Sequence, residues 1–210
     1  PYEGNPGVRL ARLPKSQSLL VNKGFKSEGA KKIAERLDKK DLVGHTIGIS
    51  AGSSNLPQVN TINKAIDDYL ETLEIFSKRP YVSFFELNIS CPNTAMSEGF
   101  AIPKNFEKLV KAIKIKQPIF VKMPNEIKFA EAEDLIKTSL KNNIRGFIFS
   151  NLVKNRNNQA FIKEEIAKFA DFKGNFSVKP AERNANNLIS QTRKKFGKEL
   201  AIIGLRRVFS

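Results

Sequence analysis

Residues 84–94, Phe-Phe-Glu-Leu-Asn-Ile-Ser-Cys-Pro-Asn-Thr, decide the fold of this chain. The apolar run from Val82 to Ile89 is too short for a typical buried helix and is rich in aromatic and β-branched residues, which favours a core strand. Pro92 ends the strand, because proline has no N–H to donate to a sheet. Small polar residues follow, among them Cys91, the only cysteine in the chain. The segment is therefore predicted to be a buried strand with reactive side chains at its C-terminal end.

Strands and helices alternate on both sides of this segment. Short apolar runs predict further strands at 46–52, 118–124, 146–151 and 200–204. Helical periodicity marks 27–37, where Ser27 is the expected N-cap, and also 61–76, 106–113, 130–140, 164–169 and 185–196. Such alternation argues for a parallel sheet with crossover helices. Residues 8–13 predict at most one short edge strand in an otherwise loop-rich beginning.

The five main strands are fewer than the eight that close a barrel. Four of them end in Ser, Asn, Cys or Lys, at the position where the loops of an α/β barrel build an active site. We therefore predict an α/β fold, a (β/α)8 TIM barrel that is incomplete here and contains about strands 3 to 7 with their helices. An open doubly wound sheet is the alternative, but no complete G-x-G-x-x-G turn follows the first strand.

The chain is strongly basic, with a net charge of +15 from 36 Lys+Arg and 21 Asp+Glu. A charge of this size raises the hypothesis of a nucleic-acid partner. However, the lysines lie beside acidic residues, as in Glu107-Lys108 and Lys163-Glu164, and no helix-turn-helix, KH or RRM signature is present. We therefore expect solvated helix surfaces and no nucleic acid, although attraction for phosphate or acidic substrates agrees with the same charge.

The single cysteine excludes an internal disulfide and a zinc site built from cysteines, and no metal is expected. No apolar run approaches the ~20 residues that span a bilayer, and the chain opens without a signal peptide. A reducing cytoplasm is the expected location.

Residues 88–94, Asn-Ile-Ser-Cys-Pro-Asn-Thr, resemble the active-site strand of dihydroorotate dehydrogenases, the flavin enzymes of pyrimidine biosynthesis. Other segments share this resemblance. Substrate-side segments of the quinone-dependent class are similar to residues 4–6 with Arg9, 12–14 and 22–25. The flavin-contacting strands are similar to residues 118–122, 149–151 and 202–204. The similarity covers essentially the whole chain in the same order. It implies one flavin-binding α/β-barrel domain over residues 1–210, truncated at both ends.

The resemblance implies oxidation of dihydroorotate to orotate in UMP biosynthesis, with FMN as cofactor. Cys91 would take the C5 proton as a base while the C6 hydride passes to flavin N5. A thiol with a pKa of ~8.5 is far easier to deprotonate than a serine hydroxyl. The alternative for a lone cysteine is a buried, inert side chain.

The resemblance also assigns binding residues. Amide groups suit the N–H and C=O groups of orotate, and Lys122 would stabilise the anionic reduced flavin. Alternatively, Lys122 has no binding role and extends its ammonium group from the strand end into solvent. The substrate residues are Asn22, Asn88, Asn93 and Asn151, and the FMN residues are Ser50, Asn88, Lys122, Ser150, Asn175 and Gly204.

The chain departs from the family pattern at several positions. The quinone-dependent class has serine where Cys91 stands, whereas cysteine is typical of the cytosolic class that uses fumarate or NAD. Val178, Arg206 and Arg207 replace glycines that allow a flavin phosphate to approach the backbone. We expect quinone as the electron acceptor, with fumarate or NAD open. Association with the inner face of the cell membrane would be peripheral, through segments outside this sequence.

Two other functions remain open. One is a related flavin barrel that acts on another dihydropyrimidine, because the Asn-x-Ser-Cys-Pro pattern is shared with such enzymes. The other is a non-catalytic remnant or anion-binding module, suggested by Arg206, Arg207 and the net charge.

Overall fold

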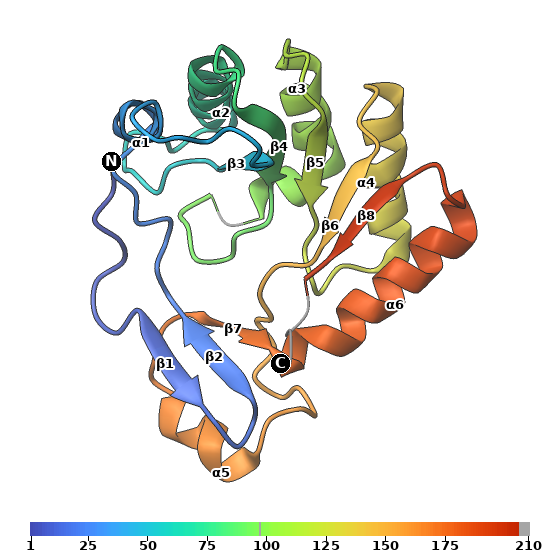
Figure 1. Ribbon diagram of the computed structural model, residues 1–210. Coiled ribbons are helices and arrows are strands. Elements are labelled where there is room, and N and C mark those ends of the chain that lie inside the picture. Colours follow the sequence, from blue (N-terminus) through green and yellow to red (C-terminus); the bar gives the residue numbers. More distant parts are fainter. Residues whose placement is uncertain (97, 206–210) are drawn as a thin grey trace.

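A five-stranded parallel sheet with helices packed on one face forms the larger part of the fold (Figure 1). The computed structural model describes residues 1–96 and 98–205. All five predicted main strands are present, in the order β3-β4-β5-β6-β8. Their bounds are β3 Ile47–Ala51, β4 Val82–Asn88, β5 Ile119–Lys122, β6 Gly146–Phe149 and β8 Ala201–Gly204.

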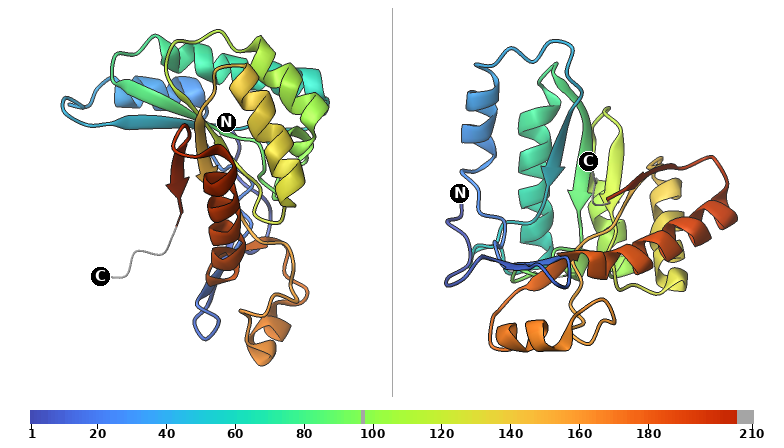
Figure 2. Two further views of the ribbon diagram at one scale, coloured as in Figure 1. Left: turned by 90° about the vertical axis from the view of Figure 1, so that its right-hand side faces the viewer. Right: turned by 60° about the horizontal axis from the view of Figure 1, so that its bottom comes forward.

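The two faces of the sheet differ because side chains alternate along each strand. On β4, Phe85 and Leu87 are fully buried in the core between the sheet and its helices. Phe84 and Glu86 point to the other face and are only partly buried. The covering helices are α1 Ala30–Leu37, α2 Ile62–Ser77, α3 Pro103–Ala112, α4 Phe129–Lys141 and α6 Lys179–Phe196, seen at another angle in Figure 2.

The face without helices has the side-chain layering of a barrel interior. The rings of Phe84 and Phe120 meet edge to face at 5.2 Å between centroids. A Cβ on Gly48 would overlap the Phe84 ring, and one on Gly146 would lie 2.6 Å from the Phe120 ring. The glycines on either side therefore make room for the two rings. The sheet is open at β3 and β8, as an incomplete barrel requires.

A second, antiparallel sheet was only partly predicted. It has the order β1-β2-β7, with β1 Leu10–Leu13, β2 Ser18–Val21 and β7 Asn175–Val178. The sequence predicted one edge strand near β1 and left β2 and β7 unassigned. Each strand has only four residues, and Ser18 of β2 pairs with Val178 of β7 about 160 residues later. A small separate core holds this sheet together with α5 Lys163–Ile166 and the 3-10 helix η2 Ala167–Phe169, while η1 spans Gly99–Ala101.

Three predicted helix ends are wrong by a few residues. Gly29, not Ser27, is the N-cap of α1, and the Ser27 hydroxyl instead accepts a hydrogen bond from Gly29 N–H at 3.1 Å. The helix α6 begins at Lys179 rather than 185, because Pro180 fits the first turn of a helix. Ile113 lies just after α3.

Glu165 of α5 fastens the turn between β1 and β2. Its carboxylate accepts hydrogen bonds from the backbone N–H of Lys15 at 3.0 Å and of Ser16 at 2.7 Å. Burial would raise the pKa of Glu165, but the hydrogen bonds from Ser16 and Lys15 outweigh it and hold the pKa below 4.5. The ionised form therefore stabilises the fold above about pH 4.5, and this contribution is lost as pH falls through the lower folded-state pKa.

We expect Glu165→Gln to lower the urea midpoint of unfolding near neutral pH and to flatten its decline between about pH 3 and 5. The amide replaces one acceptor oxygen with a donor that faces a backbone N–H, and it does not titrate. Glu164→Gln, at the exposed neighbouring position, is the control and should follow the wild type. An acid transition of Glu165→Gln identical to that of the wild type would contradict this role.

Candidate active site

The C-terminal ends of β4, β5 and β6 bring three of the predicted site residues together. Asn151 Nδ2 donates to Asn88 Oδ1 at 2.9 Å and to Ser90 Oγ at 3.1 Å. Ser90 Oγ in turn donates to the carbonyl of Lys122 at 2.9 Å. The described part of the chain gives Asn88 Nδ2 no protein partner, so this amide nitrogen is available to a ligand.

Tyr69 of α2 fixes the end of β4 from the helix side. Its hydroxyl donates to the Asn88 carbonyl at 2.8 Å. Burial raises the pKa of Tyr69 well above its ordinary value, so the hydroxyl stays protonated and remains a donor. Asn88 is thus held at its carbonyl by Tyr69 and at its side chain by Asn151.

A second cluster joins the remaining predicted asparagines. Asn175 Nδ2 donates to Asn93 Oδ1 at 2.6 Å, and Asn93 Nδ2 donates to the Val21 carbonyl at 2.8 Å. Asn5 Nδ2 donates to Asn22 Oδ1 at 2.8 Å and to the Asn93 carbonyl at 2.9 Å. We call Asn5, Asn22, Asn93 and Asn175 the asparagine cluster. Three hydrogen bonds join its members to one another, so the cluster supports the local structure as well as offering a candidate binding surface.

Two members of this region were missed as site residues. Asn5 lies at the centre of the cluster, and its Oδ1 accepts from the Tyr2 hydroxyl and from Asn55 Nδ2, both at 2.8 Å. Asn55 Oδ1 accepts from Ala95 N–H at 2.7 Å. The Gly-Asn-Pro turn was a signal for Asn5, whereas Asn55 stands in a loop without a distinguishing pattern.

Cys91 lies just past the end of β4 with 8% of its surface exposed. Burial raises the pKa of the thiol, while the Asn93 backbone N–H and the charge of Lys122 act in the opposite direction without cancelling it. A cavity of about 10 Å³ lies beside it, roughly the space of one water molecule. The thiol is therefore largely protonated at neutral pH.

A charged row crosses β3, β4 and β5 on the inner face. Ser50 Oγ donates to Glu86 Oε1 at 2.7 Å, and Lys122 Nζ lies 3.6 Å from the same oxygen. Lys122 is thus paired within the sheet and does not simply reach into solvent. Sequence reasoning missed Glu86, although one acidic residue inside an apolar strand was a usable signal.

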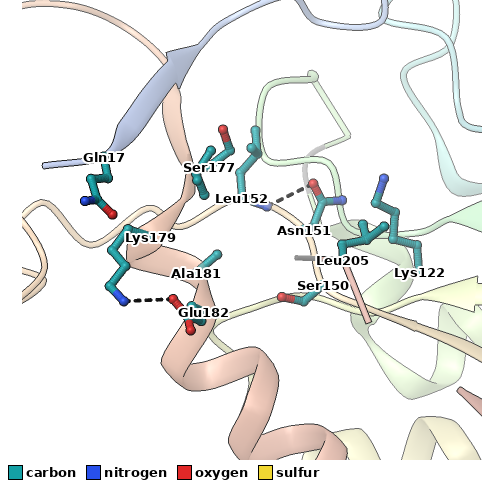
Figure 3. A pocket seen from close by; sticks show the side chains of 11 residues that line it. Gln17, Lys122, Ser150, Asn151, Leu152, Ser177, Lys179, Ala181, Glu182 and Leu205 are labelled. Atoms are coloured by element: carbon teal, nitrogen blue, oxygen red, sulfur yellow. Dashed lines mark hydrogen bonds and ion pairs between the residues drawn. The ribbon is translucent and has the colours of Figure 1, made fainter. Parts of the chain in front are cut away.

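A pocket of about 470 Å³ extends from Lys122 to the beginning of α6 (Figure 3). Lys122, Ser150 and Asn151 lie at one end, while Lys179 and Glu182 of α6 lie at the other. Lys179 Nζ pairs with Glu182 Oε2 at 3.0 Å. The remaining lining residues are Gln17, Leu152, Ser177, Val178, Ala181 and Leu205.

Buried hydrogen bonds hold the walls of this pocket. Asn125 Nδ2 donates to Ser150 Oγ at 2.6 Å and to the Ala181 carbonyl at 2.9 Å, which joins β6 to α6. Leu205 N–H donates to the Phe149 carbonyl at 2.8 Å and places the residue after Gly204 beside the pocket. Arg206 and Arg207 lie outside the described residues.

Residues 1–96 and 98–205 contain no group of three metal-ligating side chains that could hold an ion. Within the same residues, no helix is both long and apolar enough to cross a membrane.

A parallel sheet with polar side chains gathered at the C-terminal ends of its strands defines a protein of the α/β-barrel class, which places its chemistry at that end. The comparison with known sequences narrows the class. A profile of dihydroorotate dehydrogenase matches residues 1–210, and the chain belongs to this family.

Curated relatives carry the name dihydroorotate dehydrogenase (quinone). The protein from Chloroflexus aurantiacus is 25% identical over 218 residues, which cover 98% of this chain and 58% of the relative. The Bartonella tribocorum protein is 28% identical, with 98% and 56% covered. The chain therefore spans less than two thirds of the length of these relatives.

Solved structures confirm the fold. A dihydroorotate dehydrogenase from Eimeria tenella in complex with ferulenol superposes with a TM-score of 0.80 at 18% identity, covering 100% of this chain and 61% of that chain. The ligand-free form gives 0.81 at 20% identity, covering 99% and 63%. The prediction of an incomplete TIM barrel is therefore right.

Gly24 makes the asparagine cluster sterically possible. Its φ is +64°, and a Cβ would overlap the Asn5 side chain. We expect Gly24→Ala to destabilise the protein by about 2–3 kcal/mol in urea unfolding, because it adds a left-handed alanine and displaces Asn5. Gly44→Ala is the matched control, since Gly44 has a φ of +80° and nothing within 4 Å of a Cβ. It should cost only about 1 kcal/mol. Equal losses would show that contact with Asn5 is unimportant.

Proposed function

We propose that this chain forms the central part of an FMN-dependent dihydroorotate dehydrogenase that oxidises dihydroorotate to orotate in UMP biosynthesis. The observation that carries the proposal is the convergence of Cys91, Asn88 and Lys122 at the ends of two adjacent strands, β4 and β5. Family membership supports the substrate. We also propose that residues 1–210 form one flavin-binding domain, completed as a barrel by strands outside this sequence.

Cys91 acts as the base in this proposal. Its thiolate takes the proton from C5 of dihydroorotate and becomes a thiol, while the C6 hydride leaves and the C5–C6 double bond forms. FMN bound in the pocket supplies the hydride acceptor. Burial beside Phe100 and Ile89 excludes water from the thiol, which raises its pKa and strengthens its basicity once deprotonated.

The amide groups of Asn88 and the asparagine cluster orient the substrate. Asn88 Nδ2 is available to donate to a ligand carbonyl, and Asn22 Nδ2 is also without a partner in the described part of the chain. Orotate presents C=O and N–H groups that match such donors and acceptors. Asn93 and Asn175 hold the surface in place through their mutual hydrogen bond. Asn151 orients Asn88.

The pocket fits one end of FMN better than the other. At one end, a flavin ring would meet the charge of Lys122 and the hydrogen-bonding groups of Ser150 and Asn151. Ser50 supports this end indirectly, because it donates a hydrogen bond to Glu86, which is paired with Lys122. Gly204 ends β8 opposite Phe149, next to Ser150. Val178 and Glu182 line the other end of the pocket, at the start of α6, and they do not suit a dianionic phosphate.

Quinone is the proposed electron acceptor, because the curated relatives bear that word in their names. The cysteine at position 91 instead matches the class that uses fumarate or NAD. We propose a cytoplasmic reaction, with any attachment to the inner face of the membrane made by segments outside residues 1–210.

Substitution of Cys91 tests the base. In the full-length protein, Cys91→Ala should lower the rate of flavin reduction by dihydroorotate at least about 100-fold while FMN stays bound, because general-base catalysis contributes on that scale. Cys91→Ser should keep part of the activity, since a hydroxyl can act in the same position. Stopped-flow bleaching of the flavin measures both, with dihydrouracil as the competing substrate. Unchanged reduction in Cys91→Ala would remove this residue from the base role, and bleaching by dihydrouracil alone would reassign the substrate.

The pH dependence gives a second test. Because burial raises the pKa of the Cys91 thiol above its ordinary value, the reduction rate should rise about tenfold per pH unit between about pH 6 and 8. Cys91→Ser should lack this thiol titration. Absorbance spectra recorded at each pH serve as the control, because they show whether the flavin stays bound. A wild-type rate that is flat over the same range would contradict a thiolate base.

A further inference from the structure

Val178 adopts a backbone conformation that normally requires glycine. Its φ is +74° and its ψ is −123°, close to the first central position of a type II′ turn, where glycine dominates. A β-branched side chain is strained at positive φ, since its Cβ crowds the neighbouring backbone. The conformation is therefore imposed on Val178 by its surroundings.

Those surroundings hold the residue on both sides. Val178 pairs with Ser18 in the register of β2 and β7. The next residue, Lys179, donates its N–H to the Gln17 carbonyl at 3.3 Å and begins α6. Strand pairing before Val178 and helix geometry after it leave the chain no room to relax, because Pro180 fixes the first turn.

The strained residue stands at the start of α6 on the pocket wall. Lys179 N–H is already used, and Pro180 has none, so the donor left in the first turn is the N–H of Ala181, which lines the same pocket. A glycine at 178 would leave the backbone open to a bound anion. The isopropyl group of Val178 occupies that approach.

We propose that Val178 obstructs the phosphate end of the flavin pocket, so that this protein gains little affinity from the FMN phosphate and binds FMN and riboflavin about equally. This inference rests on the proposed flavin site. It concerns only the end of the pocket at α6 and leaves the ring end at Lys122 unchanged.

The test compares FMN and riboflavin binding to the full-length apoprotein by quenching of flavin fluorescence. The wild type should bind both within about threefold. Val178→Gly should bind FMN at least about tenfold more tightly with riboflavin unchanged, because the free Ala181 N–H at the positive end of the α6 dipole gains a charged acceptor. The same variant should raise the Tm of the apoprotein by about 2–5 °C as the strain is relieved.

Two further variants serve as controls for the effect of Val178→Gly. Val178→Ala keeps a Cβ at positive φ and should give a smaller gain of the same sign in FMN affinity. Val43→Gly, at a position 90% exposed and away from the pocket lining, should change neither flavin affinity and should not raise the Tm. If flavins bind but Val178→Gly leaves the FMN-to-riboflavin ratio unchanged, the inference fails while the proposed function stands. If no variant binds either flavin, the proposed function fails and this inference with it.

Discussion

The side chain of Asn93 joins the two sheets, and the geometry of the site depends on this contact. Its Nδ2 reaches the Val21 carbonyl at 2.8 Å, and its Oδ1 receives Asn175 Nδ2 at 2.6 Å. Asn93 follows β4, whereas Val21 and Asn175 are paired neighbours in β2 and β7. The antiparallel sheet is thereby positioned over the ends of the parallel strands, in the lower part of Figure 1. The wall of the pocket formed by Gln17, Ser177 and Val178 depends on that placement.

A second constraint on the structure is the limited room for aromatic rings on the inner face of the parallel sheet. Phe84 and Phe120 lie beside Gly48 and Gly146, which have no Cβ to compete with the rings. One layer beyond, the side chains are no longer apolar, and Ser50, Glu86 and Lys122 interact across three strands. Along each of these strands, apolar packing therefore gives way to polar and charged contacts within two residues.

The sequence predicted what short-range patterns determine and missed what distant pairing determines. Apolar runs such as 82–89 and helical periodicity identified all five parallel strands. The strand β2 was not predicted because it has only four residues and because one of its two partners, β7, is equally short and lies far along the chain. Among polar residues, resemblance supplied Asn88 and Lys122, but the role of Asn5 depends on a network of contacts up to 88 residues distant. No local pattern encodes such a network.

The burial of Cys91 has a consequence for the chemical durability of the protein. Oxidation by peroxide and alkylation require a thiolate that the reagent can reach. With 8% of its surface exposed, a raised pKa and a neighbouring cavity no larger than one water, Cys91 meets neither condition at neutral pH. The burial that raises the pKa of this thiol thus also protects it from oxidants in solution.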